Sequence, residues 1–233
     1  ILSHALRGSA LSEHGMRSHI AELTDTVAAY RSSRSGSRIR EIGRLARKLA
    51  AAHRVEWEEP DRLSDQTFDR IVELHLARQG TLRSKGWRRD TVFEHHDSRA
   101  AIRTLVERAA SEGRSRHLLL LADGAIIGFL LGFREADHVL AFLTGVDARF
   151  LEYGPGGLVF WEYVQRAFAA TGTRRIEFGP GTTFVKATVS TATPASYGLR
   201  WDPTGIGASR FRRAAYDRLR ALSERRAGRG SEG

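Results

Sequence analysis

The residues best suited to chemistry lie between His138 and Lys186, where apolar segments alternate with glycine-rich turns. The turn Tyr153-Gly154-Pro155-Gly156-Gly157 separates a predicted strand, HVLAFLTGV, from a predicted helix, LVFWEYVQRAFAA. A glycine-rich turn before a helix offers free N–H groups and the positive end of the helix dipole, so it can bind an anion. The turn lacks G-x-x-x-x-G-K-[ST] and G-x-G-x-x-G, which excludes a Walker loop and a dinucleotide fingerprint. An ordinary strand-to-helix turn is the alternative interpretation.

Two charged residues follow this turn along the chain. Glu177 lies on the next predicted strand, and Lys186, one of three lysines, comes shortly after Gly179-Pro180-Gly181. A carboxylate can accept a proton or hold an amine, and an ammonium group can stabilise developing negative charge. Alternatively, Glu177 pairs with Arg174 or Arg175, and Lys186 is a surface lysine.

The order of these segments resembles one branch of the GNAT acyltransferase superfamily, which contains FemAB-like and cellulose-biosynthesis (CelD/BcsL-like) acetyltransferase domains. The matching residues are Tyr153-Gly154-Pro155-Gly156, Glu177-Phe178-Gly179 and Lys186, and the likeness covers about residues 38 to 200. The resemblance implies an α/β (α+β) GNAT fold, with a mixed, mostly antiparallel central sheet flanked by helices.

The resemblance also implies where an acyl donor would bind. Coenzyme A would lie between two strands that separate, with its pyrophosphate at Tyr153–Gly157 and its pantetheine amides on the backbone of Leu143 to Val146. Lys186 would neutralise charge on the donor or the oxyanion, and Glu177 would act as a general base or as an anchor for the acceptor amine. We therefore expect Lys186 and Glu177 to be catalytic.

Three further residues are candidates for contact with the acceptor. Trp87 and His95 lie between Gln79 and Asp97, where helical periodicity fails and a long connection is expected. Asp147 follows a predicted strand and could orient an amine, although an aspartate in that place often forms a turn. The cluster that begins at His95 lacks H-x-x-x-H spacing, so we expect no metal site.

Positive charge is concentrated in two flanking segments of a chain with net charge +10. Residues 31–54 hold eight basic residues and one acid, and residues 210–229 hold eight arginines and two acids. Both segments show apolar residues at helical spacing, which predicts basic helical extensions at both ends of the domain. Their basic faces are either simply solvated or a platform for an acidic partner, namely tRNA, an acyl carrier protein or an anionic membrane surface.

Between these flanks the pattern predicts a mixed α/β domain. We expect a strand at Val55–Glu59, helices that begin at Ser64 and Ser98, and a hairpin at Asp123-Gly124. The last strands are expected at Ala187–Thr193 and Tyr197–Trp201.

We expect three regions. The first is an N-terminal helical segment over residues 1–54, for which the remnant of a first GNAT-like half is an alternative interpretation. An acyltransferase domain over 55–207 and a basic helix and tail over 208–233 follow. The chain has no cysteine, which excludes disulfides, and it has no run of 18 apolar residues. Its first residues do not resemble a signal peptide, so a cytoplasmic, bacterial protein is expected.

These features together predict an N-acyltransferase that uses acyl-coenzyme A, such as acetyl-coenzyme A, and a small-molecule or peptide amine. An aminoacyl-tRNA-dependent transferase of the FemAB type and a catalytically silent GNAT-like binding module remain as alternatives.

Overall fold

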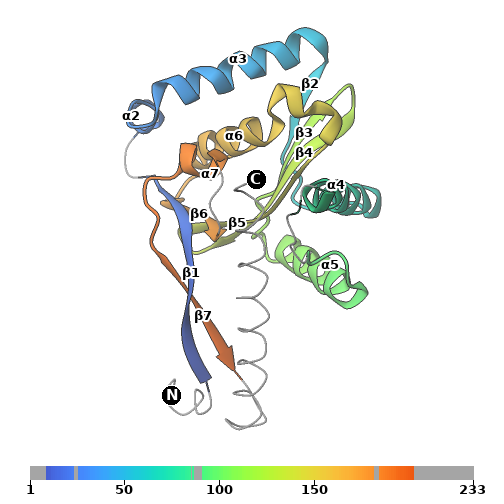
Figure 1. Ribbon diagram of the computed structural model, residues 1–233, viewed down its shortest axis with the longest axis vertical. Coiled ribbons are helices and arrows are strands. Elements are labelled where there is room, and N and C mark those ends of the chain that lie inside the picture. Colours follow the sequence, from blue (N-terminus) through green and yellow to red (C-terminus); the bar gives the residue numbers. More distant parts are fainter. Residues whose placement is uncertain (1–8, 24–25, 85, 87–90, 181–183, 202–233) are drawn as a thin grey trace, which may run out of the picture. The chain divides into compact units, whose positions relative to one another are not determined.

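The computed structural model describes residues 9–23, 26–84, 86, 91–180 and 184–201 (Figure 1). The chain divides into two compact units, Met16–Pro194 and a second unit made of Ile1–Gly15 and Ala195–Gly233. In the second unit the described residues belong to two neighbouring strands, the beginning of β1 (Ser9–Glu22) and β7 (Ala195–Trp201).

A six-stranded mixed sheet forms the centre of the unit Met16–Pro194, in the order β2-β3-β4-β5-β6-β1. Every neighbouring pair among these strands is antiparallel except β5 and β6, which run parallel. The sheet confirms the predicted mixed, mostly antiparallel architecture. The remaining strand bounds are β2 (Val55–Glu58), β3 (Leu118–Ala122), β4 (Ala125–Glu135), β5 (His138–Val146) and β6 (Arg175–Pro180).

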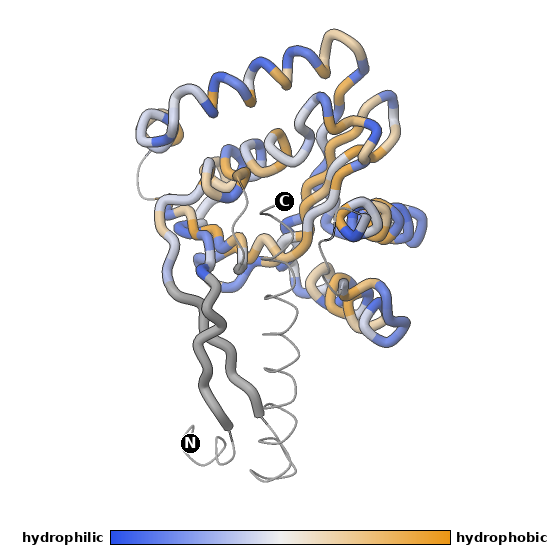
Figure 2. Tube along the Cα trace, in the orientation of Figure 1, coloured by the Kyte–Doolittle hydropathy of each residue, from blue (hydrophilic) through white to orange (hydrophobic). Residues whose placement is uncertain are grey.

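Helices cover both faces of the sheet (Figure 1). The α4 and α5 helices lie on one face, and α3, α6 and α7 lie on the other, with the short α2 beside α3. The strands are mainly hydrophobic along their length, whereas the outer sides of α3, α4 and α5 carry hydrophilic residues (Figure 2). The helix bounds are α2 (Val27–Ser32), α3 (Gly36–Ala52), α4 (Asp65–Ser84), α5 (His96–Ser111), α6 (Pro155–Ala169) and α7 (Phe184–Val189).

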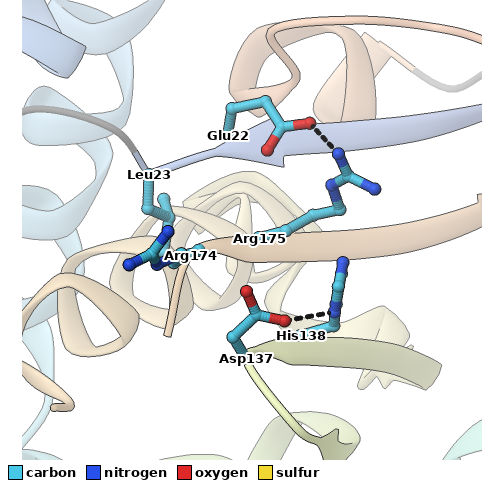
Figure 3. A pocket seen from close by; sticks show the side chains of 6 residues that line it. All are labelled: Glu22, Leu23, Asp137, His138, Arg174 and Arg175. Carbon is cyan, nitrogen blue, oxygen red and sulfur yellow. Dashed lines mark ion pairs between the residues drawn. The ribbon is translucent and has the colours of Figure 1, made fainter. Parts of the chain in front are cut away.

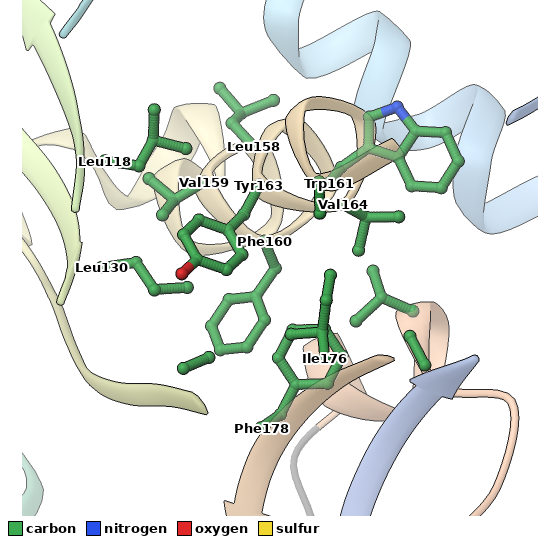
Figure 4. Packing of buried hydrophobic residues seen from close by; sticks show 14 of the residues in the cluster. Leu118, Leu130, Leu158, Val159, Phe160, Trp161, Tyr163, Val164, Ile176 and Phe178 are labelled. Atoms are coloured by element: carbon green, nitrogen blue, oxygen red, sulfur yellow. The ribbon is translucent and has the colours of Figure 1, made fainter. Parts of the chain in front are cut away.

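The α6 helix is the central element of one core cluster (Figure 4). Pro155 occupies its first turn, where proline needs no hydrogen-bond acceptor, and Phe160 packs against Phe178 of β6 with ring centroids 5.3 Å apart. Burying each large apolar side chain contributes about 1.5–3 kcal/mol. This packing fixes α6, and with it the glycine turn at its beginning, against the sheet. The buried α6 residues include Leu158, Val159, Phe160, Trp161, Tyr163 and Val164.

Several local predictions are confirmed. The hairpin between β3 and β4 turns at Asp123-Gly124, whose φ angles of 51° and 80° are those of the primed turn that suits twisted strands. The hydroxyl of Ser64 accepts a hydrogen bond from the Thr67 N–H at 3.1 Å, so it caps α4 as predicted. The α3 helix confirms the predicted basic amphipathic helix, whereas the C-terminal one lies outside the described residues.

Two secondary-structure predictions are wrong. The N-terminal segment is not helical throughout, because Ser9–Glu22 forms β1 and pairs antiparallel with β6. The expected strand at Ala187–Thr193 begins inside a helix, since α7 extends to Val189 despite its β-branched residues. In both places tertiary contacts outweigh local propensity.

The expected long connection from Gln79 to Asp97 is also shorter than predicted. The α4 helix continues through Gly80 to Ser84, and α5 already begins at His96. A glycine in a helix weakens it by roughly 1 kcal/mol relative to alanine, which is too little to end a helix whose other residues are packed against the sheet.

Candidate functional site

The parallel strands β5 and β6 separate at their carboxyl ends. They pair only from His138 with Arg175 to Leu140 with Glu177, although β5 continues to Val146 along β4. Beyond Leu140 the backbone groups of β5 that point toward β6 therefore have no partner in that strand. Unpaired backbone N–H and C=O groups require another partner, which a bound molecule can supply. The predicted pantetheine-binding backbone, Leu143 to Val146, lies on this separated stretch.

A β-bulge marks the place where the separation begins. Leu131 of β4 lies opposite Leu143, and Gly132 lies opposite Ala141, so Phe142 is an extra residue in β5. A bulge bends its strand and leaves the extra residue outside the regular ladder. It therefore turns the end of β5 away from β6.

The glycine turn lies next to the end of β5. Gly154 has a left-handed φ of 61°, which favours glycine. A Cβ there would also lie 2.7 Å from the Leu45 side chain of α3, so both the backbone conformation and the lack of space require glycine. A Cβ on Gly156 would lie 3.7 Å from Val146, which places the turn beside the strand end. The turn can therefore approach whatever lies between β5 and β6.

The turn offers fewer donors than its sequence suggests. The N–H groups of Gly157 and Leu158 both donate to the Gly154 carbonyl, at 2.9 and 3.2 Å, and the Gly154 N–H donates to Leu151. Pro155 has no N–H group. Among the described residues of the turn, this leaves the Gly156 N–H and the dipole of α6 to attract an anion.

The α3 helix packs across this turn. Tyr153 contacts the His53 ring edge-on, with centroids 5.5 Å apart, and the Lys48 ammonium lies 4.9 Å from the Tyr153 ring centroid. Tyr153 therefore joins α3 to the turn, which is a structural role beside the predicted role in donor binding.

A cavity of about 500 Å³ lies between α3, the beginning of α6 and α7. Its walls are mostly apolar, and its polar residues come from the first two turns of α3 and from Thr188 of α7. The residues that line it are Ser37, Arg38, Glu41, Ile42, Leu45, Gly154, Gly157, Phe184, Val185 and Thr188.

Lys186 and Glu177 lie on opposite faces of the sheet. The half-buried Lys186 of α7 donates from Nζ to the Gly179 carbonyl at 3.3 Å, at the carboxyl end of β6. Glu177 is exposed and alternates with Ile176 and Phe178, which pack under α6, so it points toward the α4 and α5 face. The structure does not bring the two predicted catalytic side chains together.

The alternative pairing of Glu177 is not seen among the described residues. Arg175 pairs instead with Glu22 at 2.7 Å, and no ion pair joins Glu177 to Arg174. The carboxylate of Glu177 thus faces solvent beside Leu140, which is 38% exposed.

His19 is a residue of this region that the sequence analysis missed. Its side chain is buried, and its Nδ1 lies 2.8 Å from the Ser190 hydroxyl. That hydroxyl donates to the Lys186 carbonyl at 2.6 Å, so it accepts from His19, and Nε2 holds a lone pair that has no partner among the described residues. Burial, and then the charge of Lys186, lower the pKa of His19. No sequence motif indicates this cluster, because only the pairing of β1 with the segment after α7, where Ile20 lies opposite Ala192, creates it.

Asp147 forms a turn and is held by two arginines. Its carboxylate accepts a hydrogen bond from the Arg149 N–H at 3.0 Å and pairs with Arg149 at 2.7 Å and Arg70 at 3.0 Å. The hydrogen bond from the Arg149 side chain contributes most to lowering the pKa of this carboxyl. These contacts agree with the turn-forming interpretation. His95 lies exposed at the beginning of α5, and Trp87 lies outside the described residues.

A second cavity, of about 440 Å³, lies at the other end of the parallel strands (Figure 3). It is lined by Leu23 and Arg174 and by two ion pairs, Glu22 with Arg175 and Asp137 with His138, each at 2.7 Å. Ligands of parallel sheets bind at the carboxyl ends of the strands, so this cavity is not the predicted donor site.

Within the described part of the chain, no group of three or more His, Asp or Glu residues could hold a metal ion. None of the helices in that part is both long and apolar enough to cross a membrane.

A mixed sheet that opens at its parallel pair, beside a glycine turn and a helix N-terminus, defines the GNAT class of acyltransferase fold. Residues 36–187 match the family model for the acetyltransferase (GNAT) domain, and the chain belongs to that family. No curated protein matches the sequence.

Solved structures share the fold at low sequence identity. A conserved protein of unknown function from Bacteroides thetaiotaomicron superposes with a TM-score of 0.56 at 11% identity, over 85% of this chain and 65% of that one. FemX superposes with a TM-score of 0.55 at 8% identity, over 85% of this chain and 65% of that one. L-PGS from Bacillus licheniformis superposes with a TM-score of 0.50 at 10% identity, over 90% of this chain and 66% of that one. The chain thus spans about two thirds of each of these structures, which support the fold alone.

Proposed function

We propose that the protein is an N-acyltransferase that moves an acyl group from acyl-coenzyme A to the amine of a small molecule or peptide. The observation that carries the proposal is the separation of β5 from β6 beside the Gly156 N–H. In a GNAT-family chain, such an opening offers backbone partners to the amides of a pantetheine arm.

In this proposal the donor enters from the side of α6. The pyrophosphate lies at the beginning of α6, where the helix dipole and the Gly156 N–H attract it. The arm then extends along Leu143 to Val146 and brings the thioester to the bulge at Phe142.

The reaction needs few protein groups once the reactants are aligned. The neutral amine attacks the thioester carbonyl carbon, a C–N bond forms, and an electron pair moves onto the oxygen. When the tetrahedral intermediate collapses, the C–S bond breaks, the amine proton is lost and the thiolate is protonated. Lys186, at the carboxyl end of β6, stabilises the negative charge on the oxygen or the sulfur.

The position of Glu177 supports a role in binding the acceptor. Because it faces the α4 and α5 side of the sheet, it meets an amine that approaches from that side, opposite to the donor. Its carboxylate can hold the ammonium form or take its proton.

One observation favours aminoacyl-tRNA as a second candidate donor. The outer face of α3 exposes Arg40, Arg44 and Arg47, and the other side of the helix packs over the same glycine turn. Clustered arginines attract the phosphates of a nucleic acid, and they would equally attract an acidic acyl carrier protein.

Calorimetry and turnover test the proposal together. Coenzyme A at a hundredfold excess over its Kd should stabilise the protein by about 2.7 kcal/mol, and acetyl-coenzyme A should release free thiol in the presence of an amine panel. Binding without thiol release would leave a silent binding module. Absence of binding by both coenzyme A and acetyl-coenzyme A would refute the proposed donor.

A further inference from the structure

Phe184 is the most exposed of the large apolar residues that the structure describes, with 67% of its surface accessible. It begins α7, directly at the cavity between α3 and α6. The guanidinium of Arg38, from α3, lies over its ring, 4.5 Å from the centroid. A solvent-exposed aromatic ring with a cation over part of its face can stack against another flat group.

The cavity behind this pair joins it to the proposed donor site. Gly154 and Gly157 form part of its wall, so the cavity begins at the turn where the pyrophosphate is proposed to lie. Among the described residues that line it, none belongs to β5 or β6, so it lies apart from the opening where the thioester is proposed to react. It is therefore placed to receive the opposite end of the donor molecule.

The spacing of residues on α3 determines which side chains form this wall of the cavity. Arg38, Ile42 and Leu45 follow one another at intervals of four and three residues, which places all three on one face of the helix. The face has apolar side chains within the cavity and the cation of Arg38 at its edge. Glu41 also lines the cavity, and its carboxylate is paired with Arg44 at 2.7 Å. The cavity volume of about 500 Å³ lies within the range of small-molecule sites.

We propose that this cavity binds the adenine ring of coenzyme A, which stacks on Phe184 beside Arg38. The inference rests on the proposed function and extends it to the nucleotide end of the donor. Adenine has flat apolar faces that suit Ile42, Leu45 and the Phe184 ring, and the adjoining phosphates place negative charge near Arg38.

A comparison of two ligands distinguishes contacts with the nucleotide end of coenzyme A from contacts with its pantetheine arm. Isothermal titration of the full chain with coenzyme A is compared with 4′-phosphopantetheine, which lacks the adenosine. The variant Phe184→Ala should weaken coenzyme A binding between about fivefold and about a hundredfold, the range found for bases that stack on aromatic residues. It should leave the affinity for 4′-phosphopantetheine unchanged. Arg38→Gln should act in the same direction.

A cavity-filling variant gives an independent measurement. A Cβ on Gly157 meets Ile42 at an ordinary 3.7 Å, so Gly157→Leu should fold and extend its side chain into the cavity. It should exclude coenzyme A more strongly than 4′-phosphopantetheine. Leu105→Ala is the matched control, because Leu105 is an exposed apolar residue, 39% accessible, on α5 at the other face of the sheet. If Gly157→Leu fails to fold, Phe184→Ala and Arg38→Gln still test the adenine site.

The outcomes distinguish this inference from the proposed function. If the wild type binds coenzyme A and Phe184→Ala binds it equally well, or loses both ligands equally, the adenine site is refuted and the donor proposal stands. If the wild type binds neither ligand, the donor proposal fails. If it binds only a tRNA acceptor-stem fragment, in a manner that depends on Phe184, coenzyme A is refuted as the occupant.

Discussion

Buried His117 should make the stability of this protein sensitive to mild acid. Its ring is 2% exposed just before β3 and packs edge-on against Phe133, with centroids 5.7 Å apart. Neither ring nitrogen has a hydrogen-bond partner among the described residues. Burial lowers the pKa of His117 to about 4, from 6.5 in an exposed histidine.

The size of the effect follows from these two pKa values. Between pH 6.5 and pH 4 the unfolded chain binds a proton at this histidine and the folded chain does not, so the free energy of unfolding falls as the pH falls. A shift of one unit corresponds to about 1.36 kcal/mol. His117 should therefore remove about 2 kcal/mol of stability between pH 7.5 and pH 5, and about 3 kcal/mol once the pH lies below both pKa values.

Urea denaturation of wild type and His117→Leu at pH 7.5 and pH 5 measures this effect. The variant should lose about 2 kcal/mol less than the wild type between the two pH values, because the other titrating groups are common to both proteins. His96→Asn, an exposed histidine on α5, is the control and should leave the difference unchanged. If His117→Leu shows the same pH dependence as the wild type, the ring is not buried in a neutral form and the reasoning fails.

Further variants test the site and the packing around it. Lys186→Ala should lower kcat about a hundredfold or more with little change in KM, measured by thiol release; a change in KM alone would assign Lys186 to binding. Gly156→Asp should abolish coenzyme A binding in calorimetry without unfolding the chain, since its Cβ has room beside Val146; equal affinity would remove this turn from the site. Gly132→Ala should destabilise by about 1–3 kcal/mol in urea, because its Cβ would overlap Tyr163 Oη, whereas Gly80→Ala, with open space, should not destabilise. If tRNA is the donor, log affinity should fall with log salt by about 0.9 per phosphate contact on duplex, and a shallow slope would refute that reading.

Local patterns were sufficient for most of the sheet and the helices next to it. The hairpin at Asp123-Gly124, the cap at Ser64 and the apolar α6 helix each depend on neighbours within a few residues. The fold itself was implied by the resemblance of the ordered motifs around Tyr153–Gly156, Glu177–Gly179 and Lys186 to the GNAT superfamily. The family match over residues 36–187 agrees with that prediction.

Contacts between distant segments could not be predicted. The strand at Ser9–Glu22 has no strong alternation, and its bridge to Ala192 places His19 against Ser190, 171 residues away in sequence. Likewise, nothing in the glycine turn indicates that Leu45 covers Gly154. Such contacts depend on which apolar faces remain uncovered after the sheet forms, and a single sequence does not contain that information in a local pattern.

The opening between β5 and β6 explains why the two predicted catalytic residues can lie on opposite faces. In the described sheet, this opening is where the pairing of β5 with β6 ends. In the proposed reaction, a thioester that enters from the side of α6 would reach the level of Phe142, and an amine held by Glu177 would approach from the side of α4 and α5. Lys186 would then act from the donor side at the end of β6. If donor and acceptor bind from separate faces, substitutions near Leu140 should change acceptor preference without changing coenzyme A affinity. A Leu140→Ala variant with altered coenzyme A affinity and unaltered acceptor preference would contradict this division.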